Sequence, residues 1–147
     1  MKRMILLLAC VCVALTAMAQ DALFKKYGNT RGVETVFISK AMLSMMPTVE
    51  VNDKRIASKK IDRIQILSCE RPSMVRAIKA EALACFERGR YEEMMRMRDD
   101  DDQTIIYSKA LGKGINEFVL LEVEHDEINI INIRGRITLS DIRHLAD

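Results

Sequence analysis

The sequence contains no tryptophan and few other aromatic residues, prolines, glycines or histidines. Its 147 residues include three Tyr, four Phe, two Pro, six Gly and two His. So few aromatic side chains give little surface for stacking on bases, and nucleic-acid binding is not expected. The prolines, Pro47 and Pro72, mark breaks between elements, and no Pro- or Gly-rich stretch forms a linker. A chain of this length without a linker predicts one compact domain.

Recognised catalytic motifs are also missing. The sequence has no Gly-x-Ser-x-Gly elbow, no His-Glu-x-x-His helix and no phosphate-binding glycine loop. The two imidazoles, His125 and His144, lack partners at the spacing that a metal site or a catalytic pair requires. The sequence therefore predicts a protein that is not an enzyme and that carries no cofactor.

The first 19 residues have the three parts of a signal peptide. Lys2 and Arg3 precede an apolar run from Met4 to Leu15, and Thr16-Ala17-Met18-Ala19 places small residues where a signal peptidase cleaves. The run is shorter than the ~18 residues expected of a membrane span. Cleavage after Ala19 predicts a mature domain over residues 20–147, periplasmic or secreted, without a stable membrane span.

Two alternatives to simple export stay open. Leu7-Leu8-Ala9-Cys10 resembles a lipobox, although Leu8 is large for its position and the apolar run continues past Cys10. The segment could instead be retained as an anchor. Removing Lys2 and Arg3 from the 23 basic residues leaves 21, which balance the 21 acidic residues. A mature net charge of zero also argues against a nucleic-acid binder.

Apolar spacing predicts several helices. The clearest runs from Pro72 to about Arg88, where apolar residues recur at helical spacing and Gly89 ends the pattern. Short helices are expected before Gly28, after Ser39 and near Leu139–Leu145, the last with a capping box.

Runs rich in β-forming residues predict an antiparallel sheet. Strands are expected at residues 33–38 and 61–67, with a polar loop at 48–60 between them. Four further segments with short separators are typical of hairpins, although the first also fits a helix. They are Tyr91–Arg98, Thr104–Leu111, Ile115–Glu124 and Glu127–Arg134. The predicted class is α+β: an antiparallel sheet of four to five strands with a C-terminal meander, and helices packed mainly on one face.

Several stretches in order resemble domain of unknown function family 4252. They are Val36-Phe37-Ile38-Ser39-Lys40-Ala41-Met42, Tyr91-Glu92-Glu93-Met94-Met95-Arg96-Met97-Arg98-Asp99, Phe118-Val119-Leu120-Leu121-Glu122-Val123 and Ile133-Arg134-Gly135-Arg136-Ile137-Thr138-Leu139. The resemblance implies a small exported protein or lipoprotein of a Gram-negative envelope, and it supplies no catalytic residues. Arg134 and Arg136 depart from the acidic tail associated with that family.

After cleavage, Cys69 and Cys85 are the remaining thiols. Cys85 lies ~20 Å along the helix that begins at Pro72, and that helix doubles back on its strand. The two Cα atoms would then be farther apart than the ~7 Å that a disulfide allows. We predict two free, buried or half-buried thiols.

Charged clusters offer weaker candidates. His125 at a hairpin tip and the run Asp99–Asp102 are the residues on which a metal-dependent or hydrolytic enzyme would depend, but a solvated turn is the simpler interpretation of each. A basic cluster could meet anionic lipid or an acidic protein, or could simply solubilise a loop. It comprises Lys54, Arg55, Lys59, Lys60 and Arg63.

The last strands are apolar on both faces, whereas a one-sided antiparallel sheet should alternate apolar and polar residues. Either loops or the N-terminal segment cover the second face, or the face binds a second copy or another envelope protein. The residues of this interaction face would be Ile106, Phe118, Leu120 and Ile130. We predict a non-catalytic interaction or accessory module, with a binder of lipid or another apolar small molecule as a further alternative.

Overall fold

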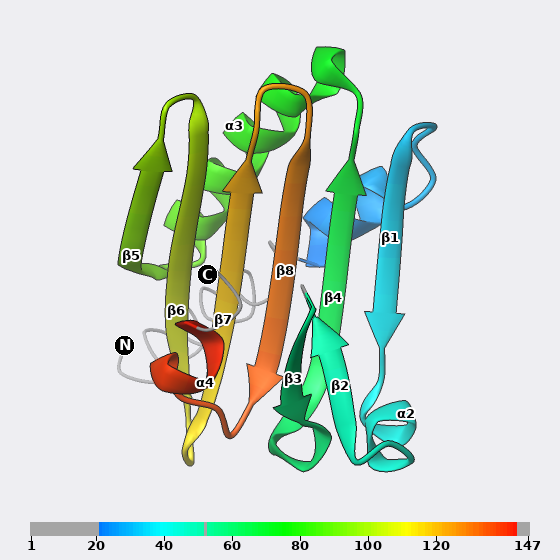
Figure 1. Cartoon of the computed structure of the whole chain (residues 1–147), viewed down its shortest axis with the longest axis vertical. Coiled ribbons are helices and arrows are strands. Elements are labelled where there is room, and N and C mark those ends of the chain that lie inside the picture. The colour runs from blue at the N-terminus through cyan, green and yellow to red at the C-terminus, as the bar shows by residue number, and fades with distance from the viewer. Residues whose placement is uncertain (1–20, 52, 144–147) are drawn as a thin grey trace, which may run out of the picture.

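The computed structural model describes residues 21–51 and 53–143 and contains a six-stranded antiparallel sheet (Figure 1). The strand order is β1-β4-β8-β7-β6-β5. The strands are β1 (Val33–Ile38), β4 (Ile61–Cys69), β5 (Glu92–Asp99), β6 (Asp102–Gly112), β7 (Ile115–Val123) and β8 (Ile128–Gly135). The α+β class and the C-terminal meander are confirmed. The sheet has one strand more than the upper estimate, because the segment at 91–98, which also fitted a helix, forms the edge strand β5.

Helices and one small hairpin complete the fold. They are a helical segment at 21–27, α2 (Lys40–Ser44), β2 (Thr48–Val51), β3 (Lys54–Ala57), the 3-10 turn η1 (Ser58–Lys60), α3 (Pro72–Arg88) and α4 (Leu139–Arg143). Pro72 occupies the first turn of α3, where its missing N–H is not needed, and Gly89 caps the other end. Ser39 caps α2 by accepting from the Met42 amide.

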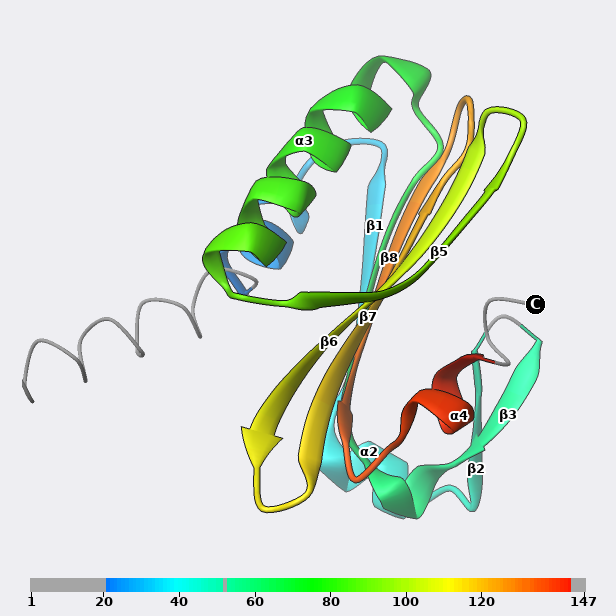
Figure 2. The ribbon, with the colours of Figure 1, turned by 90° about the vertical axis from the view of Figure 1, so that its left-hand side faces the viewer.

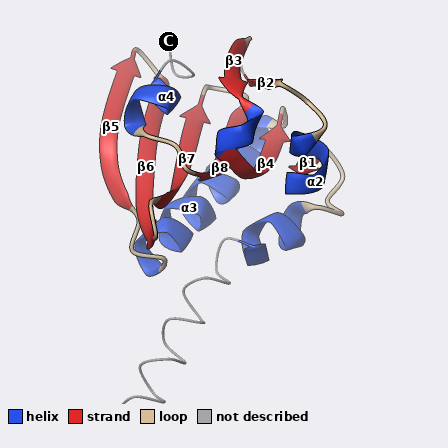
Figure 3. Cartoon of the chain, turned by 90° about the horizontal axis from the view of Figure 1, so that it is seen from below, coloured by secondary structure: helices blue, strands red, loops and turns tan. Residues whose placement is uncertain are grey.

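Elements pack against both faces of the sheet, but over different halves of it. Figure 2 shows α3 beside one end of one face, and α4 with the β2–β3 hairpin beside the other end of the opposite face. Figure 3, seen along the strands, shows the sheet between these two layers. We call the two sides the α3 face and the hairpin face. As expected, the longer helical segments, α3 and residues 21–27, share the α3 face, and the five-residue helices α2 and α4 lie on the hairpin face.

Each face has its own apolar core. On the α3 face, Leu67, Val119 and Leu121 of the sheet pack against Ile78 and Phe86 of α3. On the hairpin face, a second buried cluster joins the sheet to α2, β2, β3 and α4. It includes Leu43, Val49, Val51, Ile56, Ile64, Ile106, Leu120, Ile131 and Ile142.

The predicted polar loop at 48–60 is wrong, because it contains the β2–β3 hairpin and η1. Val49, Val51 and Ile56 alternate with exposed charged residues, so one side of each four-residue strand is buried against the sheet. Such short strands give little pattern in a sequence. Residues 1–20 and 144–147, which carry the predicted signal peptide, Cys10 and His144, lie outside the described residues. Within the described residues, no helix is both long and apolar enough to span a membrane.

Candidate functional site: an open strand edge and a row of charged side chains

The predicted interaction face is not exposed. Ile106, Phe118 and Leu120 are buried on the hairpin face, and Ile130 is buried on the opposite, α3 face. Ile106, Phe118 and Leu120 are buried because the hairpin and α4 pack on that face of the sheet. Ile130 is buried in the cluster that includes α3. The β2–β3 hairpin lies in the segment at 48–60 that was predicted to be a loop.

Exposed apolar side chains gather elsewhere. Among the described residues, Val36, Phe37, Met42, Met45 and Met94 are the large apolar side chains that remain exposed, and four of these lie between positions 36 and 45. Phe37 is 62% exposed and Met45 is 81% exposed. We call Val36, Phe37, Met42 and Met45 the apolar edge. Isolated exposed apolar residues are ordinary, but a group of four in one short segment is not.

Two residues of the apolar edge, Val36 and Phe37, lie on the edge strand β1, and Met42 and Met45 lie in and just after α2, which follows that strand. Strand β1 ends the sheet, and its only partner among the described strands is β4 (Figure 1). The pairing runs from Val33–Cys69 to Ile38–Ile64 without a register shift. Phe37 lies opposite Gln65 and Val36 lies opposite Ile66, so their side chains point to opposite faces of the sheet.

The other edge of the sheet is different. Strand β5 carries a bulge between Glu93 and Met95, and it is rich in charge. Arg96 donates two hydrogen bonds to Glu93, at 2.8 and 2.6 Å, which lowers the pKa of that carboxyl. Bulges and charged side chains are common devices that keep an edge strand from pairing with another chain. Strand β1 has neither a bulge nor more than one charged residue, Glu34.

A second feature is a row of charged side chains across the α3 face. Arg63 of β4 lies opposite Arg134 of β8, Arg134 lies opposite Glu117 of β7, and Glu117 lies opposite Lys109 of β6. We call these four residues the charged row. It lies toward the β6–β7 turn and beside Tyr91, which follows the C-terminal end of α3. From sequence, Arg63 was grouped with the basic cluster, because the register that pairs it with Arg134 cannot be read from sequence.

Glu117 is the centre of the charged row. Its side chain is only 5% exposed, and it accepts a hydrogen bond of 2.6 Å from the Asn132 amide. Arg63 Nη2 is 3.5 Å from one Glu117 oxygen, and Arg134 Nη2 is 4.0 Å from the other. Arg63 Nη1 also lies 3.5 Å from Asp21, at the start of the described chain.

The Glu117 carboxylate contributes to raised pKa values of two neighbouring groups, Tyr91 and Cys85. Burial raises the pKa of the Tyr91 hydroxyl, and the nearby Glu117 carboxylate raises it further. The pKa of the Cys85 thiol is raised mainly by burial, with a smaller contribution from Glu117. A thiol whose pKa is raised is a poor nucleophile at neutral pH.

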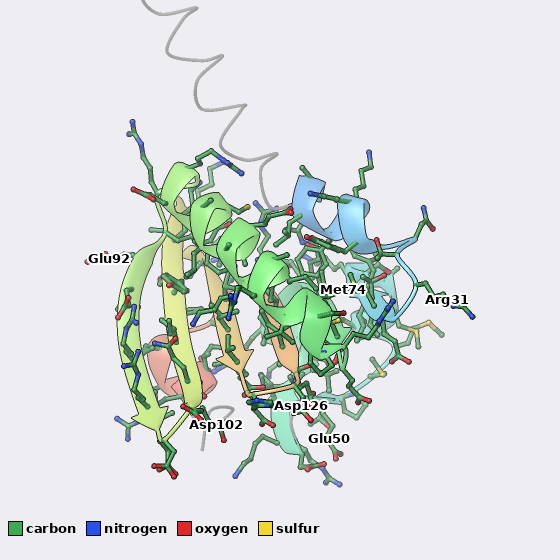
Figure 4. All side chains as sticks on the ribbon, turned by 90° about the horizontal axis from the view of Figure 1, so that it is seen from above. Arg31, Glu50, Met74, Glu92, Asp102 and Asp126 are labelled. Carbon is green, nitrogen blue, oxygen red and sulfur yellow. The ribbon has the colours of Figure 1, made fainter. Side chains whose placement is uncertain are left out.

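The prediction of free thiols is confirmed: Cys69 and Cys85 are both unpaired and buried. The other candidates are scattered. Asp102 and Asp126 mark turns at the same end of the sheet in Figure 4. Among residues 21–51 and 53–143, no three His, Cys, Asp or Glu side chains could together hold a metal ion.

The basic cluster is divided between elements. Lys54 and Arg55 lie on β3, whereas Lys59 and Lys60 lie in η1. Lys60 pairs with Asp141 of α4 at 3.2 Å, and Arg63 belongs to the charged row on the other side of the sheet. The cluster is therefore not one surface.

Comparison with protein families identifies the chain. The family model described as "Domain of unknown function (DUF4252)" matches residues 27–145. The chain belongs to this family. Comparison with curated proteins finds no match, and comparison with solved structures finds none either. The family match spans both the apolar edge and the charged row, and the description of the family names no activity.

Proposed function

We propose that the protein is an exported, non-catalytic interaction module of the cell envelope that binds an extended segment of a partner protein along β1. The observation that carries the proposal is the contrast between the two sheet edges. One edge has a bulge and alternating charges, whereas the other is regular, apolar and unpaired by any described strand. The export part rests on the predicted signal peptide at residues 1–19.

The geometry favours strand addition. A free edge offers backbone N–H and C=O groups that an incoming strand can pair with, and side chains beside the edge select the sequence. Phe37 lies on the α3 face, while Val36 and α2 lie on the hairpin face. A partner strand with apolar residues at alternate positions on both faces therefore fits best.

Peptide binding tests this proposal. Random nonapeptides displayed on phage would be selected on the full chain, and the recovered peptides measured by fluorescence polarisation. We expect alternating apolar sequences whose affinity falls by about tenfold or more in Phe37→Lys, because one buried aromatic contact is lost. Met94→Lys is the matched control, since Met94 is also exposed but lies on the protected edge. Equal binding by both variants would overturn the proposal.

Solution mass separates a partner from a second copy. We expect the full chain to be monomeric by light scattering. A dimer that Phe37→Lys converts to folded monomers would assign the edge to a second copy and would contradict binding of a partner segment. The alternative of an enzyme predicts a retained metal ion, or an activity that His125→Ala abolishes.

The lipid-binding alternative predicts a closed apolar cavity. A hollow of about 310 Å³ lies between residues 32–34 and 68–71, but its lining includes Glu34, Glu70 and Arg71. A charged lining suits an acyl chain poorly. The strand edge is therefore the better-supported surface.

A further inference from the structure

The charged row places like charges side by side. Arg63 and Arg134 are direct cross-strand neighbours on the α3 face. Like charges directly opposite each other destabilise a sheet unless another group compensates them. The row contains Glu117 as its single carboxylate, against Arg63, Arg134 and Lys109. Asp21 is the nearby addition, and its side chain is 52% exposed.

The N–H donors of Arg63 and Arg134 have few close acceptors. Within the described chain, the Nε atoms of Arg63 and Arg134 are both buried without an acceptor. The contacts to Glu117 measure 3.5 and 4.0 Å. A good charge-assisted hydrogen bond measures about 2.7–2.9 Å, so neither guanidinium has the close bidentate partner for which its shape is suited.

Two arginines with few close acceptors and one lysine thus lie around a single carboxylate. From this arrangement we infer that the charged row binds a small, soluble anion bearing a phosphate group. A phosphate carries about −1.5 to −2 charges at neutral pH and has three acceptor oxygens. It would supply the charge that the row lacks and close acceptors for guanidinium nitrogens other than the buried Nε atoms. The inference is independent of the proposed function, because Phe37 and α2 take no part in it.

The row is accessible but recessed. The side chains of Arg63 and Arg134 are 20% and 36% exposed, so both are partly open to solvent. Lys109 is half-buried, with its ammonium 5.3 Å from the centre of the Tyr91 ring. Side chains held this far inside the surface would meet a small anion more readily than a flat membrane.

The test uses inorganic phosphate as the probe and the full chain as the protein. Calorimetry would measure phosphate affinity, and thermal unfolding would compare phosphate with chloride at equal ionic strength. We expect phosphate to raise the unfolding midpoint, because a ligand that binds only the folded state stabilises it. Loss of one guanidinium contact, in Arg134→Gln or Arg63→Gln, should weaken the affinity by about tenfold or more.

Three controls keep the result decisive. Arg55→Gln removes a cation that is 78% exposed on β3 and should leave phosphate affinity unchanged. Arg134→Lys keeps the charge, so it serves where Arg134→Gln does not fold, and it should still bind more weakly than the wild type. Glu117→Gln should bind phosphate more tightly, because the competing carboxylate is gone; a purely structural role for the row predicts no such gain.

Other outcomes would overturn the inference. These are no phosphate binding by the wild-type chain, equal stabilisation by chloride, or an equal loss in Arg55→Gln. Co-sedimentation with phosphatidylglycerol vesicles without any response to inorganic phosphate would also overturn it, since the ligand would then be a lipid surface. Phe37→Lys should leave phosphate affinity unchanged, which separates failure here from failure of the proposed strand addition.

Discussion

Among the polar side chains, we expect replacement of Glu117 to lower the free energy of unfolding most. It is buried and accepts hydrogen bonds from Asn132 and Arg63. Glu117→Ala would leave two neighbouring arginines without their common carboxylate. Because hydrogen bonds to charged groups are each worth about 1.5–3 kcal/mol, we expect a loss of that size in the free energy of unfolding. Urea denaturation measures it, with exposed Glu124→Ala as the control, and equal losses would contradict the prediction.

The three tyrosines should ionise late. Burial, followed by a hydrogen bond from the hydroxyl to Glu81 at 2.9 Å, raises the pKa of Tyr27 to about 12. The pKa values of Tyr91 and Tyr107 are also raised, mainly by burial. A raised folded-state pKa stabilises the fold below the unfolded value near 10, and this stability is lost as pH rises through the folded value.

Phenolate absorbance measures this titration. At the pH where free tyrosine is half ionised, the native protein should show little phenolate, and unfolded protein should show about half of its tyrosines as phenolate. Tyr27→Phe should remove part of the alkaline stability loss. Three normal tyrosine titrations in the native state would contradict the prediction.

Gly135 allows a close approach between two strands. A Cβ at this position would lie 2.1 Å from the Lys60 carbonyl oxygen and 2.8 Å from Ile61 Cα, beside the irregular pairing of β4 and β8. Because backbone rather than a flexible side chain blocks the space, we expect Gly135→Ala to cost about 3 kcal/mol. Gly112→Ala is the control: its φ is +85° but its Cβ would meet no neighbour, so about 1–2 kcal/mol is expected. Thermal or urea unfolding compares the two.

At the scale of an element, α4 depends on its cap. The Thr138 amide donates to Asp141 Oδ2 at 2.9 Å, and Lys60 donates to Oδ1 at 3.2 Å. The backbone hydrogen bond, followed by the contact with Lys60, lowers the pKa of Asp141. A lowered folded-state pKa gives stability that is present above the unfolded value, near 4, and is lost as pH falls through the folded value.

Asp141→Asn should therefore cost about 0.5–1 kcal/mol at neutral pH and flatten the loss of stability below about pH 4. Unfolding measured across acid pH tests this. Glu50→Gln, which changes a carboxylate that is 58% exposed, serves as the control. An unchanged acid dependence in Asp141→Asn would contradict the role assigned to the cap.

Elements with a strong local pattern were predictable from sequence. The predicted bounds of β1 and α3 agree with the structure. A run of β-branched residues predicts the strand, and apolar residues at helical spacing predict the helix. Strand register was not predictable. Leu120 pairs with Ile131 rather than Ile130, and a shift of one residue reverses the face of every side chain. The charged row was missed for the same reason, since it consists of four residues that only register brings together.

At the scale of the whole molecule, the sheet is shared by two cores. Ile78 packs on the α3 face and Ile56 packs on the hairpin face, with central strands contributing side chains to both. Ile78→Val and Ile56→Val should each cost about 0.5–1.5 kcal/mol. Because the two sites share no contact, their costs should add to within about 0.5 kcal/mol in the double variant. Two separate unfolding transitions would show that the cores are independent.

Strand order also has a consequence for the time at which the sheet can form. Strand β4 pairs with β8, the last of the described strands, and among those strands β1 pairs with β4 alone. Synthesis from the N-terminus delivers β1 and β4 long before β8, the inner neighbour of β4. Until β8 emerges, the two early strands can form no more than a hairpin, and such a pair is marginally stable at best. Only β8 pairs with both β4 and β7, so its arrival joins the early hairpin to the meander and closes the sheet.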